Sequence, residues 1–141
     1  MEQLRVIERD ELILREIYRW KACGSKHIRF LAGFSGQRAT DRRLKILTDS
    51  EYIERKKFLY GVPYVYFLTN KGKSLIHVGT GKEKIKVEQI IHDRAVLDTA
   101  IYFMNKEGLS LQDIISEKQL HQLDGFRVRK HRPDFIFTKD E

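Results

Sequence analysis

Residues 25–76 constrain the fold of this chain more than any other segment, because helical and strand-like patterns alternate there around glycine-marked turns. Ser25 is expected to cap a short helix in which Ile28 and Leu31 point inward. Gly33 is expected to end this helix, since glycine adopts the left-handed backbone of a helix end at little cost. A tight turn then leads into a second helix.

The second helix is predicted to begin at Ser35 and to have two distinct sides. Thr40, Leu44 and Leu47 recur at helical spacing, which predicts a buried row. Gln37 lies in the first turn, and the outward positions i, i+3, i+4 and i+7 project together. These outward positions hold Arg38, Asp41, Arg42 and Lys45. Such a charged side is typical of a helix that contacts a polyanion and also of an ordinary solvated helix.

A basic β-hairpin is predicted to follow. Tyr52 to Leu59 and Tyr64 to Leu68 are rich in β-branched and aromatic residues, and the segment between them contains a glycine and a proline. Three adjacent cations lie on the first strand beside the turn: Arg55, Lys56 and Lys57. Because like charges repel, this arrangement favours a polyanion opposite the strand. The alternative is a charged edge that prevents strand-to-strand aggregation.

This order of elements is typical of a winged helix-turn-helix. In such a unit the second helix lies in the major groove of duplex DNA, and cationic side chains hold phosphates. We predict such a DNA-binding domain over residues 1–80, supported by a helix that Asp10 caps and that runs to about Ala22. The predicted contacts with double-stranded DNA are Lys26, Arg29, Gln37, Arg38, Asp41, Arg42, Lys45, Arg55, Lys56 and Lys57.

The net charge of +7 is confined to this half of the chain. Through Thr80 there are 16 Lys and Arg against 9 Asp and Glu, and from Gly81 onward there are 11 of each. A basic surface restricted to one motif is expected of a phosphate-binding protein, because neutralising phosphates releases condensed counterions. A winged fold that serves only protein interaction would not require this segregation.

Glycines and lysines from Gly79 to Lys86 predict a boundary, and residues 84–141 predict a second region of helices and short strands. A helix over residues 90–108 should end at Gly108. Its wide apolar side predicts packing on the first domain or a homodimer through Val87–Met104. Ser110 and Asp113 predict a helix carrying Ile114, Ile115 and Leu120, and two strand-like pieces flank Pro133.

Few residues point to catalysis. The chain has none of the common phosphate-binding, hydrolase or zinc-protease motifs, and its one cysteine and scattered histidines predict no metal and no cofactor. Glu117 followed by Pro133-Asp134 resembles the start of a PD-(D/E)xK nuclease, in which two carboxylates hold Mg²⁺. The acidic-x-Lys step of such sites is missing. We therefore predict a protein that is not an enzyme, with a metal-dependent nuclease as an alternative.

Taken together, the winged segment, the IIHDRAVLD segment, the Glu117 segment and RPDFIF resemble the replication-relaxation family of plasmids and integrative elements. That family joins a winged DNA-binding domain to a nuclease-like region, which implies a role in plasmid replication or conjugative transfer with a relaxase or replication protein as partner. The family continues beyond the point where this chain ends at Glu141. The resemblance therefore predicts a longer native chain or a natural minimal form.

The sequence thus predicts an α+β protein: a winged helix-turn-helix followed by a small helical and β region resembling the start of a PD-(D/E)xK-like fold. The predicted function is sequence-preferring binding of duplex DNA in a mobile element. A dimeric winged-helix transcriptional regulator has the same DNA-binding half and is the main alternative. The chain contains no apolar run of membrane-spanning length and no signal peptide, so we expect it in the cytoplasm and not in a membrane.

Overall fold

The computed structural model describes residues 5–21, 23–57, 63–79 and 86–108, together with the backbone of residues 114–116 and 135–137. Several sequence predictions lie outside these residues. They are the hairpin turn at 60–62, the domain boundary at 80–85, Ser110, Asp113, Glu117, Leu120 and Pro133-Asp134.

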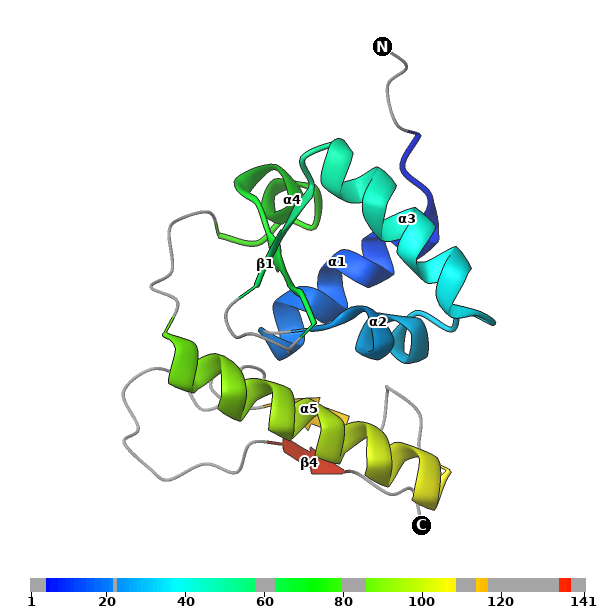
Figure 1. Ribbon diagram of the computed structural model, residues 1–141, viewed down its shortest axis with the longest axis vertical. Helices are drawn as coiled ribbons and strands as arrows, with labels where there is room; N and C mark the ends of the chain where they lie inside the picture. Colours follow the sequence, from blue (N-terminus) through cyan, green and yellow to red (C-terminus); the bar gives the residue numbers. More distant parts are fainter. Residues whose placement is uncertain are drawn as a thin grey trace.

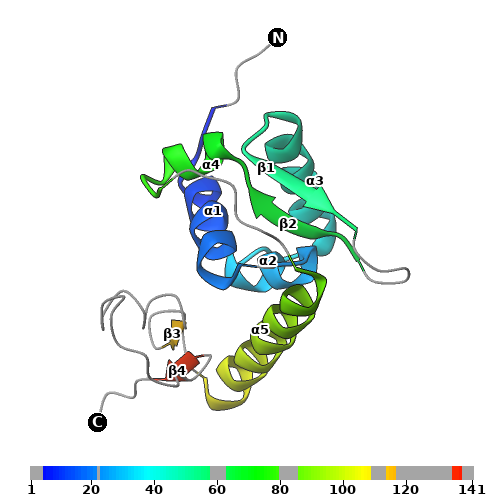
Figure 2. The same cartoon turned by 90° about the vertical axis from the view of Figure 1, so that its left-hand side faces the viewer.

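The described residues form an α+β structure with five helices and a two-stranded antiparallel ribbon, and a second short strand pair follows (Figures 1 and 2). In chain order the elements are α1 (Glu8–Trp20), α2 (Ser25–Leu31), α3 (Gln37–Asp49), β1 (Ile53–Lys56), β2 (Val65–Leu68), α4 (Asn70–Leu75), α5 (Val87–Glu107), β3 (Ile114–Ser116) and β4 (Phe135–Phe137). The coarse α+β class is therefore confirmed.

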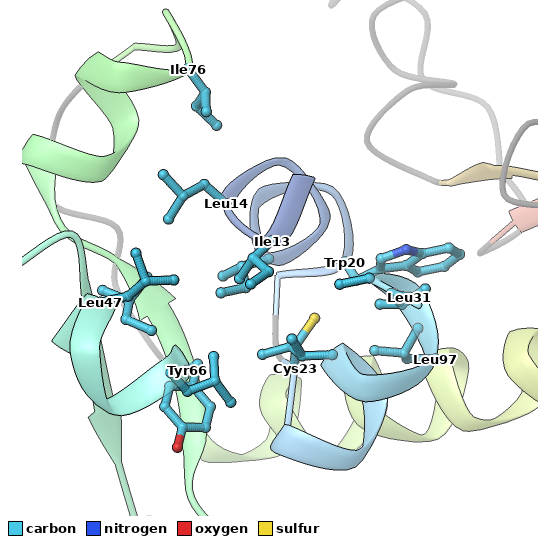
Figure 3. Close-up of a cluster of buried hydrophobic side chains, with 14 of the residues drawn as sticks. Ile13, Leu14, Trp20, Cys23, Leu31, Leu47, Tyr66, Ile76 and Leu97 are labelled. Carbon is cyan, nitrogen blue, oxygen red and sulfur yellow. The ribbon is translucent and has the colours of Figure 1, made fainter. Parts of the chain in front are cut away.

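The main core gathers around α1, whose Ile13 and Leu14 are fully buried (Figure 3). α2, α3, the ribbon, α4 and α5 each add side chains to the same cluster. Leu97 of α5 lies beside Trp20 and Leu31 in this cluster, so α5 belongs to the same hydrophobic core as the earlier helices. Burial of apolar side chains is the main force that holds these elements together.

α1 begins earlier than predicted, and the role of Asp10 differs. The residue that caps the helix is Ile7, and Asp10 lies in the first helical turn, where its Oδ2 accepts the Ile7 backbone N–H at 3.0 Å. A carboxylate near the start of a helix also complements the helix dipole. The prediction of Asp10 as the cap residue was wrong, and the helix ends at Trp20, close to the predicted end.

The turn between α2 and α3 agrees with the sequence pattern, with small shifts at the helix starts. Gly33 follows the end of α2 with φ of +70°, as predicted for a glycine in the left-handed region. Gly24, not Ser25, caps α2, and its N–H is satisfied by the Nδ1 of His27 at 2.9 Å. α3 starts at Gln37 after Gly36, two residues later than the predicted start at Ser35.

The strands of the ribbon are shorter than predicted, and their register pairs Ile53 with Leu68 and Lys56 with Val65. β2 also contacts the chain between α1 and α2, where the Tyr66 N–H donates to the Cys23 carbonyl oxygen at 2.8 Å. This bond fixes the ribbon to the helices at a point 43 residues away in sequence, because it satisfies two buried backbone groups at once.

α4 begins at Asn70, because the Thr69 hydroxyl caps it by accepting the Gly72 N–H at 3.1 Å. Gly72 has a second role. A Cβ at this position would lie 2.2 Å from the Tyr52 carbonyl oxygen, so only glycine permits this approach of helix to loop.

α5 crosses one side of the body formed by α1 to α4 (Figures 1 and 2). It ends as predicted at Gly108, which has φ of +66°. Its buried side includes Ile90, Leu97 and Met104.

The prediction of a helix that carries Ile114 and Ile115 is wrong at these two positions. Both residues lie in β3, which pairs in antiparallel fashion with β4. Two adjacent β-branched residues favour an extended backbone, and Phe135–Phe137 supplies the partner strand from a distant part of the chain. Tertiary pairing therefore overrides the capping pattern near Ser110. The strand predicted just after Pro133 is confirmed as β4.

Candidate nucleic-acid interface

The outer side of α3 carries three exposed cations, Arg38, Arg42 and Lys45. None of them makes a hydrogen bond or ion pair with another residue that the structure describes. They are held in place from the opposite side of the helix, where Thr40, Leu44 and Leu47 form the buried row that the sequence predicted. These cations therefore stay available to an anionic partner.

The other two predicted residues of α3 interact with each other. The Nε2 of Gln37 donates to the Oδ1 of Asp41 at 3.0 Å, one helical turn away. Asp41 is exposed and Gln37 is partly exposed, so both amide and carboxylate remain accessible at the start of the helix. Amide and carboxylate side chains are among those that read base edges in the major groove.

Arg43 is adjacent in sequence to Arg42 but points to the opposite side of α3. Its Nε donates to the Oδ1 of Asp10 at 2.6 Å, and its Nη2 contacts the other carboxylate oxygen. Asp10 is fully buried, so this bidentate pair joins α3 to the start of α1. The hydrogen bonds to Asp10 raise the pKa of Arg43, which keeps the guanidinium charged. Arg43 is therefore structural.

The ribbon presents its cations around an exposed aromatic ring. The Arg55 guanidinium lies 4.4 Å from the centre of the Tyr64 ring, and the Lys57 ammonium lies 6.0 Å from it. Lys56 points to the other face of the ribbon, where its Nζ lies 3.6 Å from Glu54. The three consecutive cations are exposed but are divided between the two faces of the ribbon.

Tyr66 connects the ribbon to α3. Burial raises the pKa of its hydroxyl, a hydrogen bond from Arg55 opposes this shift, and the nearby Asp41 carboxylate adds to it. The ring lies at the edge of the main core with its hydroxyl pointing away from Ile13 (Figure 3). The outer edge of α3 and the cationic strand β1 are therefore neighbours.

α2 supplies the last two predicted residues, Lys26 and Arg29, and both are exposed. The Nη2 of Arg29 donates to the Ser35 carbonyl oxygen at 3.3 Å, so this guanidinium also stabilises the turn into α3. Lys26 lies in the first turn of α2, where it has no hydrogen bond or ion pair within the described part of the chain. The structure therefore brings α3 and the ribbon together, and Lys26 lies at the start of α2.

Sequence reasoning missed two long-range pairs, each of which has one buried member. One is Asp10 with Arg43, and the other is His27 with Asp98, whose Nε2 and Oδ1 lie 2.5 Å apart. Both pairs join residues more than 30 positions apart, so no local pattern could have revealed them.

The described residues offer little for other chemistry. No group of three or more His, Cys, Asp or Glu side chains among them could hold a metal ion. Cys23 is fully buried, and burial raises the pKa of its thiol well above the ordinary value. A thiol that stays protonated is a poor nucleophile. Within the described ranges, no helix combines the length and the apolar character needed to cross a bilayer.

Comparisons with known proteins found nothing: no family model matches the chain, and neither a curated protein nor a solved structure matches it.

Proposed function

We propose that this protein binds duplex DNA through a winged helix-turn-helix formed by α1, α2, α3 and the β1–β2 ribbon. The order of elements, the tight turn at Gly33 and the contact of Tyr66 with Cys23 support this assignment. The observation that carries the proposal is the row of exposed cations on α3, namely Arg38, Arg42 and Lys45, beside a cationic ribbon.

Each group of residues has a different role in this proposal. Arg38, Gln37, Asp41 and Arg42 approach base edges in the major groove. Lys45, the ribbon cations and the exposed cations of α2 hold phosphates, which sets affinity without reading sequence. Arg29 also stabilises the α2–α3 turn, so its removal should affect folding as well as binding.

Two alanine variants test this division of roles. Arg42→Ala should weaken binding to a preferred site by about 1–3 kcal/mol and reduce discrimination, whereas Lys56→Ala should weaken binding to all sequences alike and lower the salt slope by about one unit. Arg15→Ala is the matched control, because Arg15 is an exposed cation on α1, outside the proposed surface. The measurement is fluorescence anisotropy with selected and random duplexes over a range of salt.

The proposal fails if the wild-type protein retains no duplex at low ionic strength. Equal losses of affinity on selected and random duplexes for Arg42→Ala would contradict base reading by Arg42 but would not contradict DNA binding. If Arg15→Ala loses as much affinity as Lys56→Ala, only the total charge of the protein matters.

The resemblance to the replication-relaxation family supports a further step: action in plasmid replication or conjugative transfer of a mobile element, in the cytoplasm and with a relaxase or replication protein nearby. Genomic pull-down of bound fragments tests this role. Fragments concentrated at a plasmid origin or transfer origin support it, and fragments spread over promoters oppose it. The nuclease alternative rests on Glu117 and Asp134, which lie outside the described residues, and plasmid nicking with Mg²⁺ compared with Asp134→Ala tests it.

The exposed apolar side chains of α5 favour a second candidate, a dimeric transcriptional regulator. Ile91 is 52% exposed, Tyr102 is 58% exposed, and Phe103 lies close to Tyr102 with ring centres 5.6 Å apart. Large exposed apolar side chains on one helix are typical of a contact surface. Sedimentation of the wild type and of an Ile91→Ser, Tyr102→Ser double variant tests a homodimer through this helix. A palindromic footprint would support the regulator, and a monomer at micromolar concentration would exclude it.

A further inference from the structure

α5 is held against the proposed DNA-binding elements at two points besides the main core. Ile90 packs with Val65 on the face of the ribbon opposite to Tyr66. Two turns later, Asp98 accepts a hydrogen bond from the Nε2 of His27, whose Nδ1 accepts the Gly24 N–H and therefore carries no proton. The first half of α5 is thus fixed beside both the ribbon and the start of α2.

Arg94 lies between these two anchors, one turn from each. Its Nη2 lies 3.8 Å from the position that a Cβ on Gly24 would occupy, and the Tyr64 carbonyl oxygen lies 3.7 Å from the same position. The guanidinium is therefore located where the start of α2 meets the outer end of β2. Both neighbouring elements carry exposed cations, Lys26 on α2 and Arg55 and Lys57 around Tyr64.

The surroundings leave this guanidinium without an acidic partner. Its Nε is buried and makes no hydrogen bond. Asp98, the nearest following carboxylate on the same side of α5, is engaged by His27, and Arg94 forms no ion pair with any other described residue. A buried donor without an acceptor is unfavourable, and because this Nε has no exposed surface an anion can reach the guanidinium only through its terminal nitrogens.

We propose that Arg94 binds a backbone phosphate of the duplex, so that α5 extends the DNA-binding surface beyond the helix-turn-helix and ribbon. This inference rests on the proposed DNA binding. A phosphate is the anion that fits, because a guanidinium can donate two parallel hydrogen bonds to it. The exposed side chains nearby are the cations of α2 and of the ribbon, together with the carboxylate of Asp98. Figures 1 and 2 show α5 starting beside the ribbon and α2.

The test compares the salt dependence of duplex binding for wild type, Arg94→Ala and Lys106→Ala. Lys106 is an exposed cation at the far end of α5, so its removal subtracts the same charge without touching the proposed contact. Loss of one phosphate contact should lower the salt slope by about one unit and weaken binding roughly eightfold at 0.1 M salt, with the difference vanishing near 1 M. We expect the duplex affinity of Lys106→Ala to stay within about twofold of the wild-type value, because salt screens a surface charge that lies far from the DNA.

Ethylation interference gives an independent readout that a structural role would not produce. In the wild type, ethylation of each contacted phosphate should interfere with binding, and the interference at one of these phosphates should disappear in Arg94→Ala. Arg94→Lys keeps the charge and serves where Arg94→Ala does not fold; we expect it to retain most of the salt slope but to bind more weakly than wild type.

The outcomes are distinguishable. A wild-type protein that binds no duplex overturns the proposed function and this inference with it. A wild-type protein that binds, with Arg94→Ala showing the same slope and the same interference pattern as wild type, overturns only the role of Arg94.

Discussion

Helices α3 and α5 bury similar rows of side chains and expose different chemistry. α3 buries Leu44 and Leu47 and exposes a row of cations, whereas α5 buries Leu97 and Met104 and exposes Ile91 and other large apolar groups. The inner row of each helix determines where it lies, and the outer row determines what it can bind. The outer side of α3 is therefore suited to a polyanion, and the outer side of α5 is suited to a second apolar surface.

The strongest test of the shared inner row compares Leu44→Ala with Leu97→Ala. Both side chains are fully buried in one cluster, so each truncation should lower the free energy of unfolding by about 3–4 kcal/mol through lost burial and a remaining cavity. Urea unfolding measures this change. Ile91→Ala is the control for α5, because an exposed side chain should cost less than about 0.5 kcal/mol. A small effect for Leu97→Ala would mean that α5 docks weakly and is separate from the core.

Adjacent arginines on α3 test the separation of inner and outer sides within one helix. Arg43→Ala leaves the fully buried Asp10 without its ion-pair partner, so we expect a loss of about 2–3 kcal/mol in stability. Arg42→Ala should leave stability within about 0.5 kcal/mol of wild type, because the side chain is exposed. Thermal or urea unfolding of both variants measures the difference, and equal stabilities would contradict the assignment of sides.

Tyr66 tests the connection between α3 and the ribbon. Tyr66→Phe removes the hydroxyl that bonds to Arg55 while keeping the buried ring, so we expect a loss of about 1 kcal/mol in stability. Freed from this bond, Arg55 is still held by the Tyr64 ring 4.4 Å away, and duplex affinity should fall only slightly. A double-mutant cycle with Arg55→Ala checks the pairing, and additive effects would show that the two side chains act independently.

Local patterns predicted the parts of this structure that local forces determine. The buried row of Thr40, Leu44 and Leu47 and the left-handed glycines at Gly33 and Gly108 follow from residues within a few positions of each other. These features depend on helix periodicity and on backbone preferences, which the sequence displays directly.

Features that depend on distant partners could not be predicted in this way. The local sequence predicted Asp10 as a helix cap, but Asp10 is buried against Arg43. The local sequence also predicted a helix at Ile114, but this residue pairs with Phe137 in a two-stranded sheet. For the proposed site the same limit applies. The sequence showed which cations α3 projects outward, but not that Arg43 is consumed by a buried ion pair or that Arg94 of α5 lies beside Gly24.

The smallest expected effect on stability comes from Glu16, a second buried carboxylate on α1. Asp10 faces α3, whereas Glu16 lies toward the part of the core that α5 covers. Glu16 is 6% exposed and accepts the Trp20 Nε1–H at 3.0 Å, next to the part of the core that α5 covers. Burial raises its pKa above 4.5, and the nearby Arg19 only partly opposes this shift. Above the ordinary pKa the unfolded chain releases this proton while the folded chain keeps it, so stability falls as pH rises to the folded pKa. Glu16→Gln keeps the bond from Trp20 and removes the titration. We therefore expect wild type to lose stability relative to this variant in urea unfolding as the pH rises above the ordinary pKa of a glutamate, and a difference that does not change with pH would contradict the raised pKa.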